Sequence, residues 1–216
     1  MDITMKEAAL KYLTLGGIAG PVLFTTVTLI CASLRPDYNH ISQFISELGA
    51  TGTGNAIIMN WIGFIPSGLM IAVFGMSLTM LLPKSLIARI GSVLITIFGL
   101  GMVVAGNFSC DVGCPREGSF ENLIHDQISG PIFLLGVIGI LLLGISFRNY
   151  PLWRSLWIYS VISALLALAF IVALINSIES YTTTGLWQRL LLATIFLWCG
   201  IVGLRMFKSS HGVEAV

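Results

Sequence analysis

Long uninterrupted apolar stretches constrain this chain more than any other feature of its sequence. About six of them recur, each close to the roughly 20 residues that a helix needs to cross a hydrocarbon core of about 30 Å. They lie at residues 12–34, 57–82, 86–108, 127–147, 153–175 and 186–207. Only 10% of the residues are charged, whereas roughly a quarter are charged in an average soluble domain. The sequence therefore predicts one integral membrane domain over residues 1–216.

The composition of the apolar stretches favours helices over a membrane β-barrel. Barrel strands give short segments of roughly ten residues in which apolar and polar positions alternate. Here the runs are continuous and rich in Leu, Ile, Val, Ala and Gly, and glycines such as those at 99 and 101 are typical of closely packed membrane helices. The first run exceeds the apolar region of about 7 to 15 residues in a signal peptide, so we expect it to remain as a helix. The predicted fold class is an all-α, polytopic bundle of about six transmembrane helices.

Lys and Arg lie mostly on one side of the predicted membrane. Eight of the eleven fall in the two tails and in the second and fourth connections, and only Arg35, Arg116 and Arg189 fall on the other side. Because cytoplasmic loops retain positive charge, we expect both termini in the cytoplasm, with a prokaryotic plasma membrane as the location. The acidic residues collect on the opposite, exoplasmic face.

The first exoplasmic connection contains an amphipathic pattern between Asp37 and Gly49. Its apolar residues recur at helical spacing of three and four, and His40, Gln43 and Glu47 share the opposite face. The pattern predicts a short amphipathic helix in the membrane interface, capped by Asp37 and closed by Gly49. The apolar residues are Ile41, Phe44, Ile45 and Leu48. A carboxylate near the bilayer is costly unless it is paired or functional, so this segment is either a lid that meets water or one wall of a polar pocket.

Two cysteines frame a Gly-containing turn in the second exoplasmic connection. On this side Cys110 and Cys114 would meet an oxidising compartment, so we expect a local disulfide. The alternative is a zinc site in which their thiolates join His125 or Asp111. Ser119 is expected to cap the helix that follows.

The exoplasmic connections hold nearly all side chains able to carry chemistry, and imidazole and carboxylate groups serve as acids, bases or metal ligands. The catalytic candidates are His40, Glu47, His125 and Asp126. The candidates for a divalent metal such as zinc are His40, Glu47, Asp111 and His125. The ligand-binding candidates are His40, Ser46, Glu47, Asn60, Asn107, Asp111 and His125. Together they predict a polar cup.

Several absences narrow the function. The helix interiors carry almost no charge, which argues against a proton relay, a voltage sensor or an ion-coupled pump. The sequence contains no phosphate-binding loop, and we expect neither a nucleotide nor a nucleic acid as partner. The interpretation we prefer is a protein that handles a membrane lipid or binds its headgroup in the exoplasmic cup. The alternatives are a metal-assisted hydrolase or transferase acting on lipids, and a scaffold without chemistry.

Motifs at the loop positions resemble one membrane family. They occur in the order Arg35-Pro-Asp-Tyr38, Ile45-Ser-Glu-Leu-Gly49, Asn60, Phe108-x-Cys-Asp-x-Gly-Cys-Pro115 and His125. This arrangement resembles the family called domain of unknown function 998, from the first predicted helix to the fifth. The resemblance implies a membrane protein and brings no biochemical activity with it.

A more distant similarity is to the DRAM, Frag and Sfk-like six-helix proteins. In those eukaryotic proteins an Ile-Ser-(Asp/Glu)-x-Gly element follows the first helix and a His opens the fourth. The matching residues here would be Ile45, Ser46, Glu47, Gly49 and His125. This similarity implies a role in lipid remodelling or lipid asymmetry, although Leu48 stands where those relatives commonly have Thr and the cysteine turn is an addition.

Overall fold

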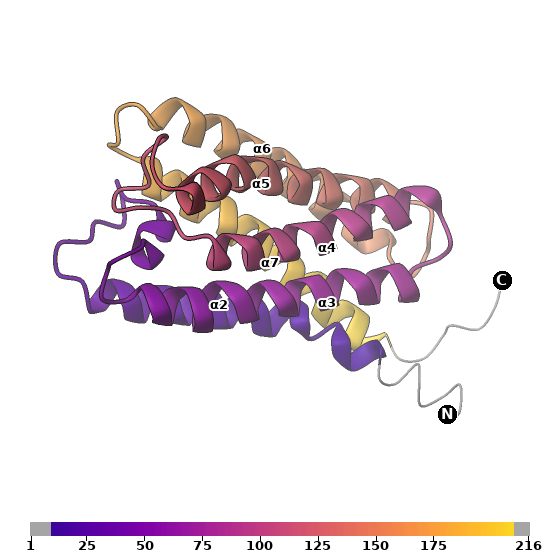
Figure 1. The fold of residues 1–216 in the computed structure, drawn as a ribbon. Helices are drawn as coiled ribbons and strands as arrows, with labels where there is room; N and C mark the ends of the chain where they lie inside the picture. Colours follow the sequence, from indigo (N-terminus) through magenta and orange to yellow (C-terminus); the bar gives the residue numbers. More distant parts are fainter. Residues whose placement is uncertain (1–9, 210–216) are drawn as a thin grey trace.

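Six helices that are long and apolar enough to cross a membrane make up the described part of the chain, residues 10–209 of a computed structural model (Figure 1). The spans are Leu10–Ser33, Ile58–Leu81, Leu86–Asn107, Phe120–Phe147, Arg154–Ser177 and Thr184–Lys208. Residues 10–209 contain no β-strand. The predicted all-α membrane bundle is confirmed, while the ends of the predicted domain, with His211, lie outside the described residues.

The connections between the spans include short helical segments. In chain order the elements are α2 (Gly16–Ser33), the 3-10 helix η1 (Ile45–Gly49), the π-helix η2 (Ile58–Phe64), α3 (Ile65–Leu81), α4 (Leu86–Asn107), α5 (Phe120–Phe147), the 3-10 helix η3 (Arg154–Leu156), α6 (Trp157–Ser177) and α7 (Thr184–Lys208). The η2 segment opens the second span, and α3 continues it. The longer connections gather at one end of the bundle, at the left of Figure 1.

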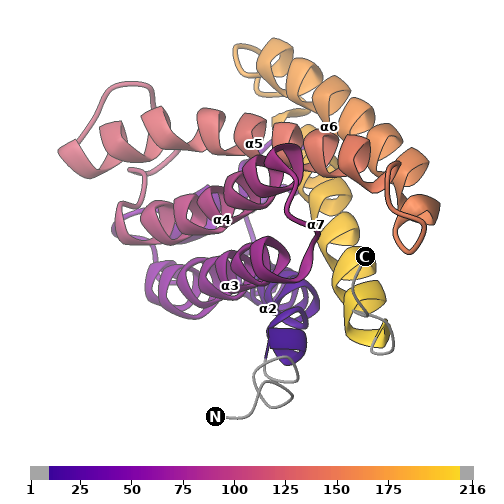
Figure 2. The same ribbon diagram turned by 90° about the vertical axis from the view of Figure 1, so that its right-hand side faces the viewer.

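The spans pack in the order in which they occur along the chain. Each of α2 to α6 contacts the next helix, and α7 returns to contact α2, so the bundle closes into a ring. Figure 2 views this ring from the end that carries the short turns, and α5 and α6 point in clearly different directions there. Neighbouring helices in such a ring bring residues from distant parts of the sequence together at the end with the longer connections.

Close backbone contacts between α3 and α4 depend on glycine. A Cβ atom on Gly68 would lie 2.6 Å from the carbonyl oxygen of Gly99, and one on Gly99 would lie 2.6 Å from the carbonyl oxygen of Gly68. No side chain fits in this space, and small residues are what allow membrane helices to approach this closely. The predicted packing role of Gly99 agrees with this contact.

The outer surface of the bundle is apolar. On α6 the buried positions are mostly small residues, such as Ser160, Ala164 and Ala167, whereas Ile162 and Leu165 are both 58% exposed. A water-soluble bundle would bury the larger residues instead. This arrangement is the one expected when hydrocarbon surrounds the helices.

The fourth span begins earlier than its apolar run predicts. The helix starts at Phe120 rather than at Gln127, because the Ser119 hydroxyl accepts a hydrogen bond from the Asn122 N–H at 3.2 Å and caps the helix. The capping role predicted for Ser119 is therefore confirmed. The helix expected after Ser119, which carries His125, and the apolar run that follows it thus form one continuous helix, α5.

The predicted amphipathic helix over residues 37–49 is wrong. Only Ile45–Gly49 is helical, as the 3-10 helix η1, and it is buried rather than lying on the surface. The side-chain oxygen of Asn39 accepts hydrogen bonds from the N–H groups of Ile41 and Ser42, at 2.8 and 3.3 Å, which turns the backbone away from a helix. Ile41, predicted to face the membrane core with the apolar residues, is instead exposed.

Candidate functional site

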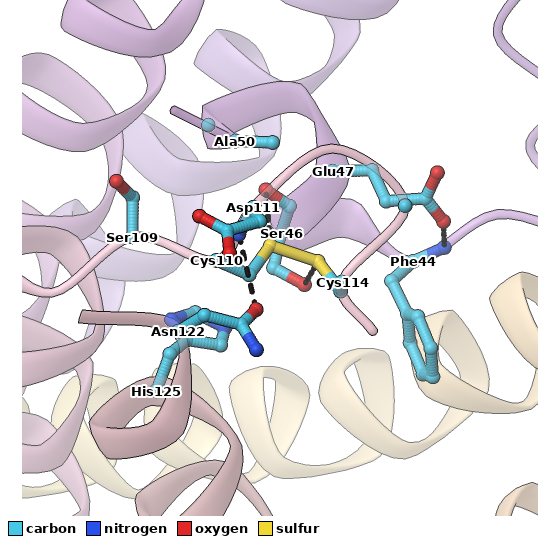
Figure 3. The surroundings of a disulfide bond; sticks show 12 residues. Phe44, Ser46, Glu47, Ala50, Ser109, Cys110, Asp111, Cys114, Asn122 and His125 are labelled. Atoms are coloured by element: carbon cyan, nitrogen blue, oxygen red, sulfur yellow. Dashed lines mark hydrogen bonds between the residues drawn. A yellow bond between two sulfur atoms is a disulfide. The ribbon is translucent and has the colours of Figure 1, made fainter. Parts of the chain in front are cut away.

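Glu47 is a buried carboxylate within the first connection. Its side chain is 3% exposed. One carboxylate oxygen accepts a hydrogen bond from the Phe44 N–H at 2.9 Å, and the other accepts one from the side-chain amide of Gln43 at 2.7 Å. Figure 3 shows Glu47 reaching back toward Phe44. These bonds close the loop on itself, so Glu47 acts as a structural anchor of η1.

The first connection is fastened to the start of α7 by a second set of contacts. Arg189 donates hydrogen bonds to the Gln43 carbonyl oxygen at 3.0 Å and to the Tyr38 hydroxyl. The side chain of Gln188 accepts a hydrogen bond from the Ile45 N–H at 2.7 Å. Residues 44–46 are thereby held over the interior of the bundle, and we call them the roof.

The connection between α4 and α5 lies beside the roof and contains the predicted disulfide. Cys110 and Cys114 are bonded to each other, and Gly113 between them has a φ of +82°, which glycine adopts without strain. The Ser46 hydroxyl lies 3.4 Å from the Cys114 sulfur (Figure 3). The disulfide prediction is confirmed. Sulfur atoms bonded to each other are not thiolate ligands, so the alternative zinc site with these cysteines is wrong.

Asp111 also has a structural role. Its carboxylate accepts hydrogen bonds from the N–H and the hydroxyl of Ser119, at 2.7 and 2.8 Å, and its own N–H donates to the side chain of Asn122 at 3.0 Å. Asn122 is almost fully buried. These bonds tie the disulfide turn to the first turn of α5.

His125 lies one turn further along α5 and is 6% exposed. Its Nδ1 atom is 2.8 Å from the carbonyl oxygen of Phe108 and 3.2 Å from that of Ala105. Carbonyl oxygens only accept hydrogen bonds, so Nδ1 carries the proton and Nε2 keeps its lone pair. Among the described residues no hydrogen bond involves Nε2. The ring therefore presents an acceptor on the side away from α4.

A cavity of about 530 Å³ opens below the roof, and we call it the chamber. Its walls are mostly apolar side chains of α5, α6 and α7, with Phe24, Phe64, Met102 and Ala105 from the other helices. The contributing residues are 129–135 of α5, Ile171, Leu174 and Ile175 of α6 with Ile178 just after it, and Gln188, Leu191 and Leu192 of α7. Its polar end consists of Ser46, His125, Asp126, Ser129 and Gln188. Ligand pockets of about 300–1,000 Å³ are typically apolar with few polar groups.

A second cavity of about 440 Å³ adjoins the chamber on the outside, and we call it the vestibule. Phe44, Cys114, Asp126 and Ile178 line both cavities. The other lining residues of the vestibule are Gly113, Pro115, Arg116, Glu179 and Tyr181. Thus an apolar cavity adjoins a cavity that is lined by one positive and two negative side chains.

The structure brings only some of the predicted site residues together. Ser46, His125 and Asp126 line the chamber, whereas Glu47 and Asp111 are engaged in the loop contacts described above. Among residues 10–209 no group of three or more His, Cys, Asp or Glu side chains is placed to hold a metal ion. The four metal candidates are therefore not assembled into one centre.

The remaining candidates lie elsewhere. His40 is exposed, with its ring 5.3 Å from that of Tyr38, and partial burial together with the nearby Arg189 lowers the pKa of His40 below its ordinary value. The side-chain amide of Asn60 donates to the Gly49 carbonyl oxygen at 2.8 Å, and that of Asn107 donates within its own helix. Neither asparagine reaches the chamber wall.

Sequence reasoning missed Gln188 and Arg189, which hold the roof in place. A signal was present: Arg189 is a cation near the start of an apolar span, on the side where positive residues are scarce, and such residues are usually paired or functional. Its partners could not be named, because Tyr38 precedes it by 151 residues. Within residues 10–209, the hydrogen bonds that Arg189 donates all go to neutral oxygens rather than to an acidic partner.

Comparison with known proteins gives one family. The model of the family described as "Protein of unknown function (DUF998)" matches residues 18–205, which extend from α2 into α7. No curated protein and no solved structure matches the chain. The distant similarity to DRAM, Frag and Sfk-like proteins accordingly stays a prediction from short motifs.

Proposed function

This chain belongs to the DUF998 family, and we propose that it binds a membrane lipid, with acyl chain in the chamber and headgroup in the vestibule. The observation that carries this proposal is that an apolar cavity adjoins a charged one, with residues such as Phe44 and Asp126 lining both. An amphiphilic ligand has the same two parts in the same order. The burial of hydrocarbon would supply affinity, and the polar groups would orient the ligand.

The position of the chamber supports entry from the bilayer. Leu134 of α5 and Ile175 of α6 line the chamber and are also 43% and 60% exposed on the apolar outside. Two full turns of α5, residues 129–135, contribute to the lining, so the cavity extends around this helix rather than lying on one side of it. A lipid could therefore enter sideways between α5 and α6 without leaving hydrocarbon.

A substitution at Gly130 tests the proposal. A Cβ atom at this position would have no protein atom within 4 Å, although Gly130 lines the chamber. We expect Gly130→Trp to fold and to place its ring at the cavity, lowering lipid occupancy at least about tenfold, a change equivalent to 1.4 kcal/mol. Native mass spectrometry of protein extracted from its membrane measures lipid retained per chain.

Ile138→Trp is the matched control, since Ile138 lies further along α5, is 36% exposed and does not line the chamber. This variant should retain lipid like the unmodified protein. Equal lipid occupancy in both tryptophan variants, or no retained lipid in the unmodified protein, would contradict the proposal.

A further inference from the structure

The size of the chamber limits how much hydrocarbon it can take. An apolar protein cavity of about 150 Å³ accommodates the six carbon atoms of benzene. On that scale, the chamber of about 530 Å³ accommodates on the order of 20 carbon atoms. This capacity suits one long acyl chain. Of the two chains of a diacyl phospholipid it has room for one.

The polar end of the chamber offers a hydrogen-bond acceptor. His125 is buried, lines the cavity, and has its Nδ1 proton committed to the Phe108 and Ala105 carbonyl oxygens. The lone pair of Nε2 has no donor among the described residues. A ligand that brings a hydrogen-bond donor to this point of the cavity could therefore donate to Nε2.

Fatty acids, diacyl lipids and monoacyl glycerolipids differ in the hydrogen-bond donor that they carry next to the acyl chain. The carboxylate of an ionised fatty acid has only acceptors. In a diacyl lipid two of the three glycerol oxygens are esters, which also cannot donate. A monoacyl glycerolipid keeps one free glycerol hydroxyl beside its ester. This hydroxyl can donate a hydrogen bond to His125 Nε2 while the chain fills the apolar part of the chamber.

The vestibule completes the recognition of a headgroup. Arg116 can bind a phosphate, and Asp126 and Glu179 can bind an ammonium group. Asp126 follows His125 in the chain and lines both cavities, so a headgroup attached to the glycerol would come next to these charges. A cavity with both signs of charge matches a zwitterion better than a neutral or purely anionic headgroup.

We infer that the ligand is a zwitterionic lysophospholipid, such as lysophosphatidylethanolamine. This inference rests on the proposed lipid site and specifies its occupant. The chain lies in the chamber, the free glycerol hydroxyl donates to His125, and the phosphate and ammonium groups lie in the vestibule near Arg116, Asp126 and Glu179.

The test compares two ligands on the unmodified protein in phosphatidylcholine nanodiscs. Radiolabelled palmitoyl lysophosphatidylethanolamine is displaced by the same unlabelled lipid or by its analogue with an O-methylated glycerol hydroxyl, with protein-free nanodiscs as the partition control. The analogue carries a methyl group in place of the donated proton, so we expect it to compete about tenfold less well. Equal competition would overturn the assignment of the hydroxyl to His125.

Two variants locate the contacts. In His125→Phe the two lipids should compete equally, because the acceptor is gone. Arg116→Gln should weaken both lipids while preserving their ratio, because Arg116 is assigned to the phosphate. A preference for the free hydroxyl that survives in His125→Phe would overturn the inference.

The outcomes separate this inference from the proposed function. If the labelled lysolipid shows no saturable binding while Gly130→Trp still reduces retained native lipid, the ligand class is wrong and the lipid site stands. If Gly130→Trp has no effect on retained lipid and the lysolipid does not bind, both are wrong.

Discussion

At the scale of single residues, the contribution of Glu47 to stability can be tested, because its two carboxylate oxygens each accept a hydrogen bond inside the protein. In Glu47→Gln one oxygen becomes an NH₂ group, which would face another N–H donor from Phe44 or Gln43. We expect the variant to lower the free energy of unfolding by about 1–3 kcal/mol, measured as thermal unfolding in detergent.

Glu117→Gln serves as the control, since Glu117 is exposed in the connection between α4 and α5. This substitution should change stability little, as most surface substitutions do. If the two variants unfolded at the same temperature, Glu47 would not be the anchor of η1.

His40 gives a prediction about pH. Partial burial and the positive charge of Arg189 both disfavour the imidazolium ion, so the pKa of His40 lies below its ordinary value. Protonation is therefore less favourable in the folded protein than in the unfolded chain, and this residue destabilises the fold as the pH falls below the ordinary pKa.

An NMR titration of ring-labelled histidine measures this directly, with His40→Gln used to assign the signal. The midpoint of His40 should lie below that of a histidine in an unstructured peptide. A midpoint at or above the peptide value would contradict the desolvation of the ring and its proximity to Arg189.

Some residue roles could be predicted from the sequence because they depend on near neighbours. The Ser119 cap and the Cys110–Cys114 disulfide each join positions within a few residues of one another. The buried state of Glu47 could not be predicted in the same way. It requires the roof to be held by Gln188 and Arg189, and that contact arises only when α7 returns to the start of the bundle.

At the scale of helices, the contact between α3 and α4 is the most sensitive to added volume. In Gly99→Leu the new side chain would meet the backbone of Gly68 and Ala72, which cannot move without separating the helices. We expect a loss of about 1–3 kcal/mol in stability, measured by thermal unfolding.

Gly130→Ala is a suitable comparison, because a Cβ at Gly130 meets no atom within 4 Å. In a helix this change should be neutral or stabilise by up to about 1 kcal/mol. Equal destabilisation by both substitutions would contradict this account, because Gly130→Ala adds a methyl group that meets no neighbouring atom.

Element boundaries show where local pattern reasoning succeeds. The apolar runs predicted every span, because burial in hydrocarbon is decided by composition over about 20 residues. The segment around His40 carries a helical pattern of apolar residues and yet forms turns, because the Asn39 side chain binds the backbone N–H groups that a helix would use. Competition of this kind depends on the geometry of single bonds, which spacing does not reveal.

At the scale of the whole molecule, the charge distribution predicts the orientation of the bundle. Lys84 lies in the turn between α3 and α4, and Glu117 lies in the connection between α4 and α5, at the opposite end of α4. Glu117→Cys should be labelled by an impermeant maleimide on intact cells, and Lys84→Cys only after permeabilisation.

The native cysteines give little background in this experiment. Cys31 and Cys199 are buried, and Cys110 and Cys114 are bonded to each other. Labelling of Lys84→Cys, but not of Glu117→Cys, on intact cells would reverse the orientation and place the vestibule in the cytoplasm.

The sequence predicted the class of the molecule and most of its polar end, but not the chamber. Charge and hydropathy locate His125 and Asp126 near one membrane surface. A cavity, in contrast, depends on how the side chains of α5, α6 and α7 fill the space between these helices. These are properties of packing between helices, on which the composition of each helix says nothing.

The most direct test of the account is to cross-link a lysophosphatidylethanolamine that carries a diazirine at the end of its acyl chain, and to map the adducts by peptide mass spectrometry. The account predicts adducts on the chamber walls, at residues 129–135 of α5 and at Leu191 and Leu192 of α7, that disappear with excess unlabelled lipid. Adducts confined to the outer surface, at residues such as Ile162 and Leu165, and insensitive to competitor would contradict it.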